Sequence, residues 1–340
     1  MTTRPIRLPA NQPHRFYRGG AAIASFRGTT FTDDHVPEDW VGSTTSIVGE
    51  ASSGLSVLPD GRLLRDAVAA EPEAFLGPDH VAAFGADPAV LVKLLDAGER
   101  LPVHLHPDGA FAREHLGARN GKNEAWLILA GGTLHLGFRE DVDPETLRGW
   151  FDAQDAEAML AASNEVAVAP GDCVFVPAGI AHAIGEGVFM VEVQEPSDLG
   201  VMLEWQGFLD RSSATMGLDV ETAFGAVRRS AVSEDEIAGW TRRSADAPEL
   251  RPGARSVVPP EAERFFRAEW LRPDPAVELE PGWSVLVAVA GSGVLTVEGG
   301  ELELARGDTV LLPHAAGAGE LTGGVEAIRC LPPRPQERSR

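Results

Sequence analysis

The chain of 340 residues has few cysteines, little positive charge and no long apolar run. Its two cysteines, Cys173 and Cys330, are too few for a disulfide framework or for a zinc site built from cysteine. Because no run of about 18 apolar residues occurs, we expect no membrane-spanning helix. The N-terminal segment MTTRPIRLPANQPHRFYRGG has no apolar signal core, which predicts a cytoplasmic protein.

Acidic residues outnumber basic ones, with 51 Asp and Glu against 29 Lys and Arg and a formal net charge of −22. A field of this sign repels nucleic acid and anionic membranes, so we expect neither as a partner. The hydrophobic fraction of 44% and the charged fraction of 24% exclude wholesale disorder. The length exceeds that of one usual compact core, which predicts two structural units.

Short β-rich runs separated by Gly and Pro dominate residues 101–195 and return after residue 257, as in a barrel or sandwich. Residues 63–95 carry apolar residues at helical or mixed spacing. The insert DPETLRGWFDAQDAEAMLAAS predicts one or two short helices, with Asp143 as the N-cap before Pro144. Residues 206–250 are expected to be helical and charged, and SADAPELRPGARS is expected to be a linker.

The two β-rich regions repeat one another. Glu124 precedes Gly131 by seven residues and Ser284 precedes Gly291 by seven. Each unit then has a Gly-Asp turn followed by a strand and a proline, at Pro177 and Pro313. The repeat predicts a mainly β protein of two small barrels, divided into residues 1–205 with a helical insert, a helical segment and linker at 206–255, a second barrel at 256–333 and a frayed tail at 334–340.

Three histidines and a glutamate in the first repeat form a candidate metal site. His104 and His106 are two apart, which puts both imidazoles on one face of a strand. Glu124 begins another strand and His182 follows the turn PAGIAH. These residue types are competent ligands for zinc, iron, manganese or nickel, although a lone histidine on a strand is more often a packing or surface residue.

The second repeat is an internal control for this site. It has Ser284 in place of the glutamate and alanines, Ala315 and Ala318, in place of the signature Gly and His, yet it keeps Gly307 and Pro313. Ligands and scaffold therefore vary separately, as expected if the ligands serve chemistry, and we expect His314 to be a surface residue.

The spacing of Gly171, Pro177, Gly179 and His182 resembles the second signature of cupin barrels, and the HxH with its later glutamate resembles the first. The segments LPVHLHP, GKNEAW and PAGIAHAIG, together with the helical insert, further resemble the type I phosphomannose isomerases, and YRGG and EDWVGST are weaker echoes. The resemblance implies two jelly-roll-like cupin barrels with a small helical portion. It also implies that His106, Glu124 and His182 are metal ligands and that Lys122 and Lys93 belong to the substrate site.

Lys93 and Lys122 are the only two lysines of the chain, and every other basic residue is arginine. The pKa of an ammonium group responds to burial, which a guanidinium group cannot imitate. Both lysines fall in the segment that carries the resemblance, which favours a functional role over chance.

Two departures from the resembled family bear on the metal and the substrate. His104 stands where the family has a glutamine ligand, so zinc is a default choice for one divalent ion, with manganese, iron, cobalt and nickel also open. The family's arginine after its Ser-Asp pair is missing, because Ser197–Asp198 is followed by LGVMLEW and the next basic residue is Arg211. The substrate is therefore a sugar phosphate held by Arg211 or another part of the chain, or an unphosphorylated sugar.

The leading hypothesis is a metal-dependent aldose–ketose isomerase acting on mannose- or fructose-type sugars, by proton transfer between C1 and C2. Lys122 is a candidate for the proton transfer, and Glu192 and Glu204 are candidates for the base or for hydroxyl binding, although each could equally be an exposed charge at a strand end. The alternatives are another metal cupin, such as an oxygenase or epimerase, and a non-catalytic sugar-binding protein. The oligomeric state is left open.

Overall fold

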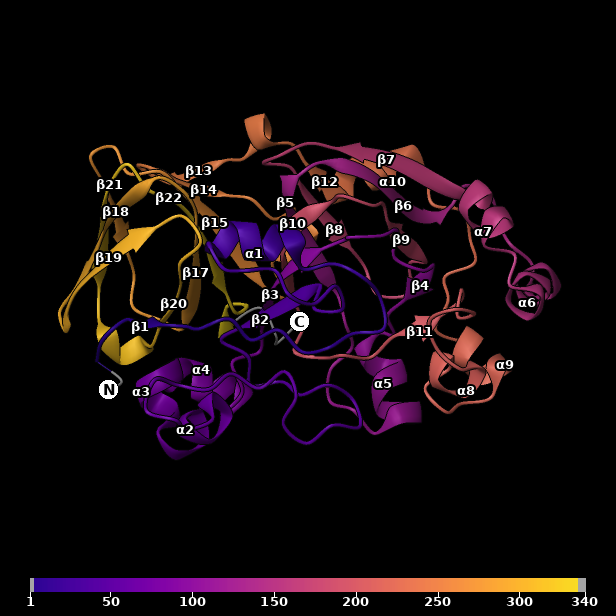
Figure 1. Cartoon of the computed structure of the whole chain (residues 1–340), viewed down its shortest axis with the longest axis horizontal. Helices are drawn as coiled ribbons and strands as arrows, with labels where there is room; N and C mark the ends of the chain where they lie inside the picture. Colours follow the sequence, from indigo (N-terminus) through magenta and orange to yellow (C-terminus); the bar gives the residue numbers. More distant parts are fainter. Residues whose placement is uncertain (1–2, 336–340) are drawn as a thin grey trace.

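Two β-barrels lie side by side in the computed structural model, which describes residues 3–335 (Figure 1). Residues 336–340 of the tail predicted to be frayed lie outside the described residues. All strand pairings described below are antiparallel. No helix within residues 3–335 is both long enough and apolar enough to cross a membrane.

The N-terminal barrel is built from two sheets. In spatial order the first sheet contains β12 (Thr241–Arg242), β8 (Cys173–Val176), β5 (Glu124–Ala130), β10 (Phe189–Gln194), β3 (Leu91–Asp96) and β2 (Glu38–Val41). The second contains β11 (Val201–Met202), β4 (His104–Leu105), β9 (His182–Ile184), β6 (Gly132–Phe138) and β7 (Ser163–Val168).

The C-terminal barrel has the same two-sheet construction. Its larger sheet contains β1 (Ile6–Arg7), β20 (Thr309–Leu312), β17 (Ser284–Ala290), β22 (Glu326–Leu331), β15 (Arg267–Leu271), β14 (Ala254–Ser256) and β13 (Glu249–Arg251). Its smaller sheet contains β16 (Ala276–Leu279), β21 (Gly319–Gly323), β18 (Ser292–Val297) and β19 (Gly300–Ala305). The N-terminal strand β1 thus joins the sheet of the distant barrel by pairing with β20.

Short helices lie in the connections between the strands. They are α1 (Ala21–Arg27), α2 (Leu64–Ala70), α3 (Pro72–Leu76), α4 (Pro78–Phe84), α5 (Gly109–Leu116), α6 (Pro144–Ala153), α7 (Ala156–Ala162), α8 (Arg211–Ala214), α9 (Val220–Phe224) and α10 (Glu234–Trp240), with 3₁₀ turns η1 (Ser244–Asp246), η2 (Pro260–Ala262) and η3 (His314–Ala316). The predicted helical insert is confirmed as α6 and α7, and the Asp143 side chain accepts a hydrogen bond from the Thr146 N–H as the N-cap of α6.

Two expectations about the chain's organisation were wrong in part. The apolar segment after α4 is not helical but forms β3, which is buried along its whole length. A strand buried on both faces loses the alternation that distinguishes it from a helix. The segment predicted as a linker contains β13 and β14, which extend the sheet through pairing with β15. The boundaries at residues 205 and 255 stay predictions.

The register of the strands matches the repeat found in the sequence. Glu124 on β5 lies opposite Val176, the last residue of β8, and Pro177 follows. Ser284 on β17 lies opposite Leu312, the last residue of β20, and Pro313 follows. The serine and the glutamate therefore occupy equivalent places at the start of equivalent strands. His314, predicted to be a surface residue, is half-buried at η3, which contacts α3.

Candidate metal centre and cavity

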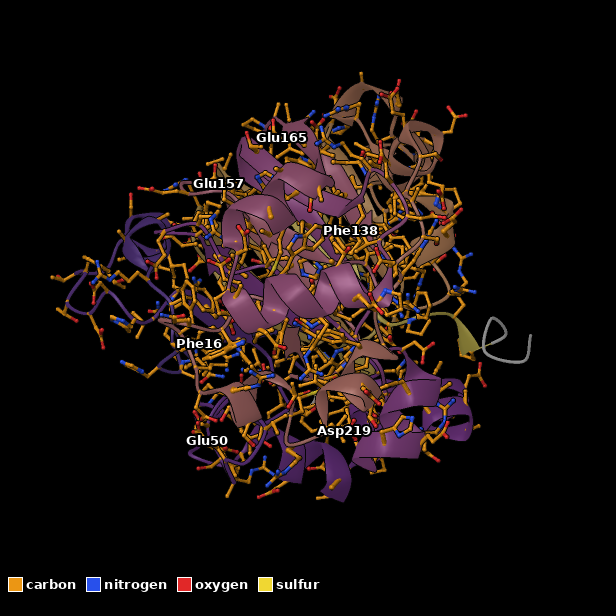
Figure 2. All side chains as sticks on the ribbon, turned by 90° about the vertical axis from the view of Figure 1, so that its right-hand side faces the viewer. Phe16, Glu50, Phe138, Glu157, Glu165 and Asp219 are labelled. Carbon is orange, nitrogen blue, oxygen red and sulfur yellow. The ribbon has the colours of Figure 1, made fainter. Side chains whose placement is uncertain are left out.

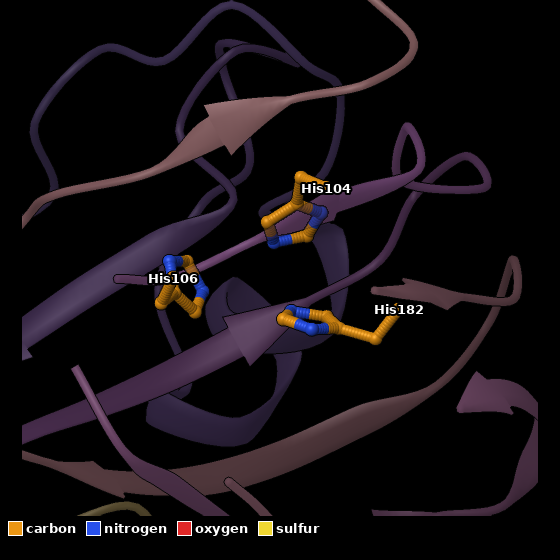
Figure 3. A group of neighbouring side chains, drawn as sticks. All are labelled: His104, His106 and His182. Carbon is orange, nitrogen blue, oxygen red and sulfur yellow. The ribbon is translucent and has the colours of Figure 1, made fainter. Parts of the chain in front are cut away.

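Three imidazole rings converge inside the N-terminal barrel (Figure 3). His104 lies on β4 and His106 follows it, while His182 begins β9, and the backbones of His104 and His182 are register partners. Ring centroids are 4.1 Å apart for His104 and His182, and 5.0 Å apart for each ring with His106. One nitrogen from each ring lies within 4.8 Å of the other two, a spacing suited to one metal ion.

Backbone carbonyls fix the orientation of all three rings. The Nδ1 atoms lie 2.8 Å from the Pro102 carbonyl for His104, 2.7 Å from the Leu199 carbonyl for His106 and 2.8 Å from the Ile180 carbonyl for His182. A carbonyl only accepts, so each Nδ1 carries the proton and each Nε2 is unprotonated, with its lone pair as an acceptor. This arrangement of the second nitrogen is typical of metal-ligating histidines.

The charge state of the rings also suits a metal. Burial lowers the pKa of His182 to about 3 and that of His106 to about 4, and it holds the pKa of His104 well below its usual range. All three rings are therefore neutral at pH 7. The Nε2 atom of His182 is buried without a hydrogen-bond partner, which leaves its lone pair for a ligand that the protein itself does not supply.

The Glu124 carboxylate, at the start of β5, lies beside the three rings. Its Oε1 atom lies 3.1 Å from His106 Nε2, and its Oε2 atom lies 3.8 Å from His182 Nε2. Burial acts to raise the pKa of the Glu124 carboxyl, but the Lys122 ammonium, 2.6 Å from its Oε1 atom, helps to hold that pKa well below its usual range. Three neutral imidazoles and a carboxylate are a donor set that fits zinc or another first-row divalent ion.

The structure brings Lys122 and Glu192 to the same place. Lys122 Nζ lies 2.6 Å from Glu124 Oε1 and 3.2 Å from His106 Nε2. Glu192 on β10 is 2% exposed and has a buried Oε2 without a hydrogen-bond partner. Burial and the charge of Glu124 raise the pKa of Glu192 to about 8. Two groups able to hold or give up a proton thus lie beside the candidate ligands.

A chain of buried ion pairs leads outward from Glu192. Lys93 on β3 is its register partner, and its Nζ lies 3.6 Å from Glu192 Oε2 and 3.4 Å from Glu38 Oε2. Glu38 also accepts hydrogen bonds from the Trp40 indole N–H at 2.6 Å and from the Tyr17 hydroxyl. Burial acts to raise the pKa of Glu38, but the positive charges of Arg15 and Lys93 hold it well below its usual range.

Most of these groups, though not His182 or Trp40, line one cavity of about 940 Å³. Its lining includes His104, His106, Lys122, Glu124, Glu192, Lys93, Glu38, Arg15, Asp198 and Met202, with Phe16 and Glu50 further along it. Figure 2 labels Phe16 and Glu50 on the same side of the molecule, in a view onto the end that carries α6 and α9.

Glu204 and Arg211 do not line this cavity within residues 3–335, so the structure corrects both expectations. Both Glu204 oxygens accept hydrogen bonds from Arg100, at 2.6 and 2.7 Å, and Oε2 also accepts the Val103 N–H at 2.9 Å. This carboxylate stabilises the start of β4. Arg211 is paired with Asp152 and lies 5.0 Å from the Phe151 ring centroid.

The sequence-based prediction missed Arg15, Tyr17, Glu38 and the cavity-lining position of Asp198. Arg15 pairs with Asp198 at 3.1 Å and with Glu38 at 3.5 Å. The segments YRGG and EDWVGST, noted only as weak echoes, contain Tyr17 and Glu38 and could have found these two residues.

Comparison with known proteins agrees with the two-barrel fold. No family model matches the chain. The chain is 26% identical over 325 residues to the mannose-6-phosphate isomerase of Streptococcus mutans, which covers 94% of this chain and 95% of that protein. It is 24% identical to the mannose-6-phosphate isomerase ManA of Bacillus subtilis, over 96% of this chain and 99% of that one.

The chain is similar to mannose-6-phosphate isomerases over nearly its whole length. The solved structure of the Bacillus subtilis mannose 6-phosphate isomerase superposes with a TM-score of 0.75 at 22% identity, covering 96% of this chain and 99% of that one. The expected mainly β fold of two barrels and the resemblance to the mannose-6-phosphate isomerases are thereby confirmed. The relatives match both barrels and not only the one that carries the histidines.

Proposed function

We propose that the chain is a metal-dependent aldose–ketose isomerase acting on mannose- and fructose-type sugars, free or phosphorylated. The observation that supports it most strongly is the convergence of three oriented, neutral imidazoles on one centre, in a relative of mannose-6-phosphate isomerases. His104, His106, Glu124 and His182 would hold one divalent ion, with zinc as the first choice. The cytoplasmic location stays a prediction.

The ion would act as a Lewis acid, polarising the sugar's carbonyl and hydroxyl oxygens as negative charge develops between C1 and C2. The chain's own residues supply the rest. Lys122 Nζ would hold or release a proton beside the bound sugar, and the raised pKa of Glu192 lets its carboxyl do the same near neutral pH. Lys93 would hold Glu192 in place through its ion pair.

Isomerisation by metal-loaded protein tests this proposal. Mannose, mannose 6-phosphate, fructose and fructose 6-phosphate are each incubated with zinc- or manganese-loaded protein, and the product is measured by NMR. We expect aldose and ketose to interconvert in one of the two pairs. Substrate-dependent O₂ consumption by iron-loaded protein, without isomerisation, would favour the oxygenase alternative instead.

A further inference from the structure

Every lysine and arginine that lines the cavity, among the residues the structure describes, is ion-paired with a carboxylate of the same cavity. Arg15 pairs with Asp198 and Glu38, at 3.1 and 3.5 Å. Lys93 lies between Glu38 and Glu192, and Lys122 contacts Glu124 at 2.6 Å. Among the described residues, each lysine or arginine of this lining therefore already has a carboxylate partner.

These ion pairs are buried, so replacing one partner of a pair by another ion costs free energy. The side chains of Lys93 and Glu192 are 2% and 3% exposed, and those of Arg15 and Asp198 are 13% and 7% exposed. A phosphate that captured Arg15 or Lys93 would leave a buried carboxylate without its partner, which is strongly unfavourable. The cations are thus held by the protein's own acids and are not a preformed anion site.

The balance of charge on the lining points the same way. Its positive side chains are outnumbered by its acidic ones, which are Glu38, Glu50, Glu124, Glu192 and Asp198. Even with Glu192 protonated, the lysines and arginines of this lining do not outnumber its carboxylates, so they provide no surplus positive charge for a phosphate dianion.

The exposed surface extends the negative field. Figure 2 shows Glu50, Glu157, Glu165 and Asp219 around the end of the molecule that carries the N-terminal barrel, and all four are exposed. The whole chain carries a formal net charge of −22. Such a field lowers the encounter rate with dianions.

The remaining lining suits an uncharged polyol. Carboxylates are acceptors only, so they can bind the hydroxyl groups of a sugar without a countercharge. Ser212 and Ser213 add hydroxyls, while Met202 and Phe16 offer apolar contact for the C–H face of a sugar ring. Met202 lies on β11 directly opposite His104, so an apolar side chain stands next to the three imidazoles.

From these contacts we infer that the site takes an unphosphorylated aldose or ketose, in preference to its sugar phosphate. This inference rests on the proposed isomerase function, which it narrows to a substrate class. It is based on the ion pairs that Arg15 and Lys93 form with carboxylates of the protein, and on the excess of carboxylates around these two side chains.

Turnover by the metal-loaded full chain is the first test. We expect kcat/KM for mannose or fructose to exceed that for the corresponding 6-phosphate by about tenfold or more at physiological ionic strength. A higher kcat/KM for either 6-phosphate would overturn the inference.

A binding experiment separates this inference from the proposed function. Mannitol and mannitol 6-phosphate cannot isomerise, and titration calorimetry measures their affinity for the metal-loaded protein. Tighter binding of mannitol, with no turnover of any sugar, would support the inference and refute the isomerase proposal. Tighter binding of the 6-phosphate, or no binding of either alcohol, would overturn the inference.

A charge variant on the cavity rim provides a matched control. Val48 lines the cavity and is 58% exposed, so Val48→Arg should fold normally. We expect it to shift the preference toward the 6-phosphate by several-fold, and we expect the uncharged Val48→Gln to leave it unchanged. An equal shift in both variants would show that charge does not set the preference.

Discussion

Glu192 and Arg329 occupy the same position in the two barrels, and the partner of each carries the opposite charge. Glu192 on β10 pairs in register with Lys93 on β3, whereas Arg329 on β22 pairs in register with Glu269 on β15. The side chains are also paired: Lys93 Nζ lies 3.6 Å from Glu192 Oε2, and Arg329 Nη1 lies 3.9 Å from Glu269 Oε2. In the second barrel, Arg329 Nε also donates to Ser284, the counterpart of Glu124, at 3.0 Å. The same scaffold thus holds a candidate metal site in one barrel and a buried arginine in the other.

Glu124→Gln and Ser284→Ala form a matched pair on equivalent strands. We expect Glu124→Gln to weaken metal binding, because a carboxylate ligand becomes a neutral amide. Ser284→Ala should keep full metal content and lower the free energy of unfolding by about 1 kcal/mol through the lost hydrogen bond. Metal content by mass spectrometry and urea unfolding check both; loss of metal in Ser284→Ala would contradict the assignment of the site to the first barrel.

Lys122→Met should retain the metal and lose turnover. Methionine keeps the length of the side chain but cannot carry a proton, and loss of a proton-transfer group costs about 100-fold or more in kcat. The measurement is kcat with the best sugar, beside metal content. Arg113→Met, at an exposed position on α5, is the control. Turnover within a few-fold of wild type would remove Lys122 from the mechanism.

We expect Glu204 to contribute to the stability of the folded protein. Glu204→Gln weakens the paired contacts with Arg100 and the acceptor for the Val103 N–H, so the free energy of unfolding should fall by about 1–3 kcal/mol. The KM for the sugar should change little, since Glu204 does not line the cavity among the described residues. A large rise in KM with unchanged stability would restore the substrate-binding role that the sequence suggested.

Glu38 should make stability depend on pH in the acid range. Its pKa is lower in the folded protein than in the unfolded chain, so its contribution to stability is fully present above the unfolded value of about 4.3. The contribution is lost progressively as the pH falls below that value. The difference in unfolding free energy between wild type and Glu38→Gln should therefore be largest at neutral pH and shrink on acidification. A difference that grows on acidification would show that the pKa of Glu38 is not lowered in the folded protein.

The sequence predicted the part of the site that depends on residues close to one another in the chain. His104 and His106 share a strand face, and His182 follows a turn that Gly179 shapes, so local geometry was enough. Helix α6 was likewise predictable, because its cap and its proline are local signals.

The missed residues depend on pairing between distant strands. Glu38 reaches Lys93 only because β2 pairs with β3 in one register, and Lys93 reaches Glu192 only because β3 pairs with β10. Single-sequence patterns do not specify such pairings. Glu204 was misread for the same reason, since its partner Arg100 lies 104 residues away.

Metal content of the purified protein, measured with activity in the same preparations, tests the central claim most directly. Wild type and His115→Ala, a change at an exposed histidine on α5, should each bind one divalent ion per chain and be active. His106→Ala and His182→Ala should lose bound metal and isomerase activity together while remaining folded. Full metal content or full activity in either variant would contradict the account.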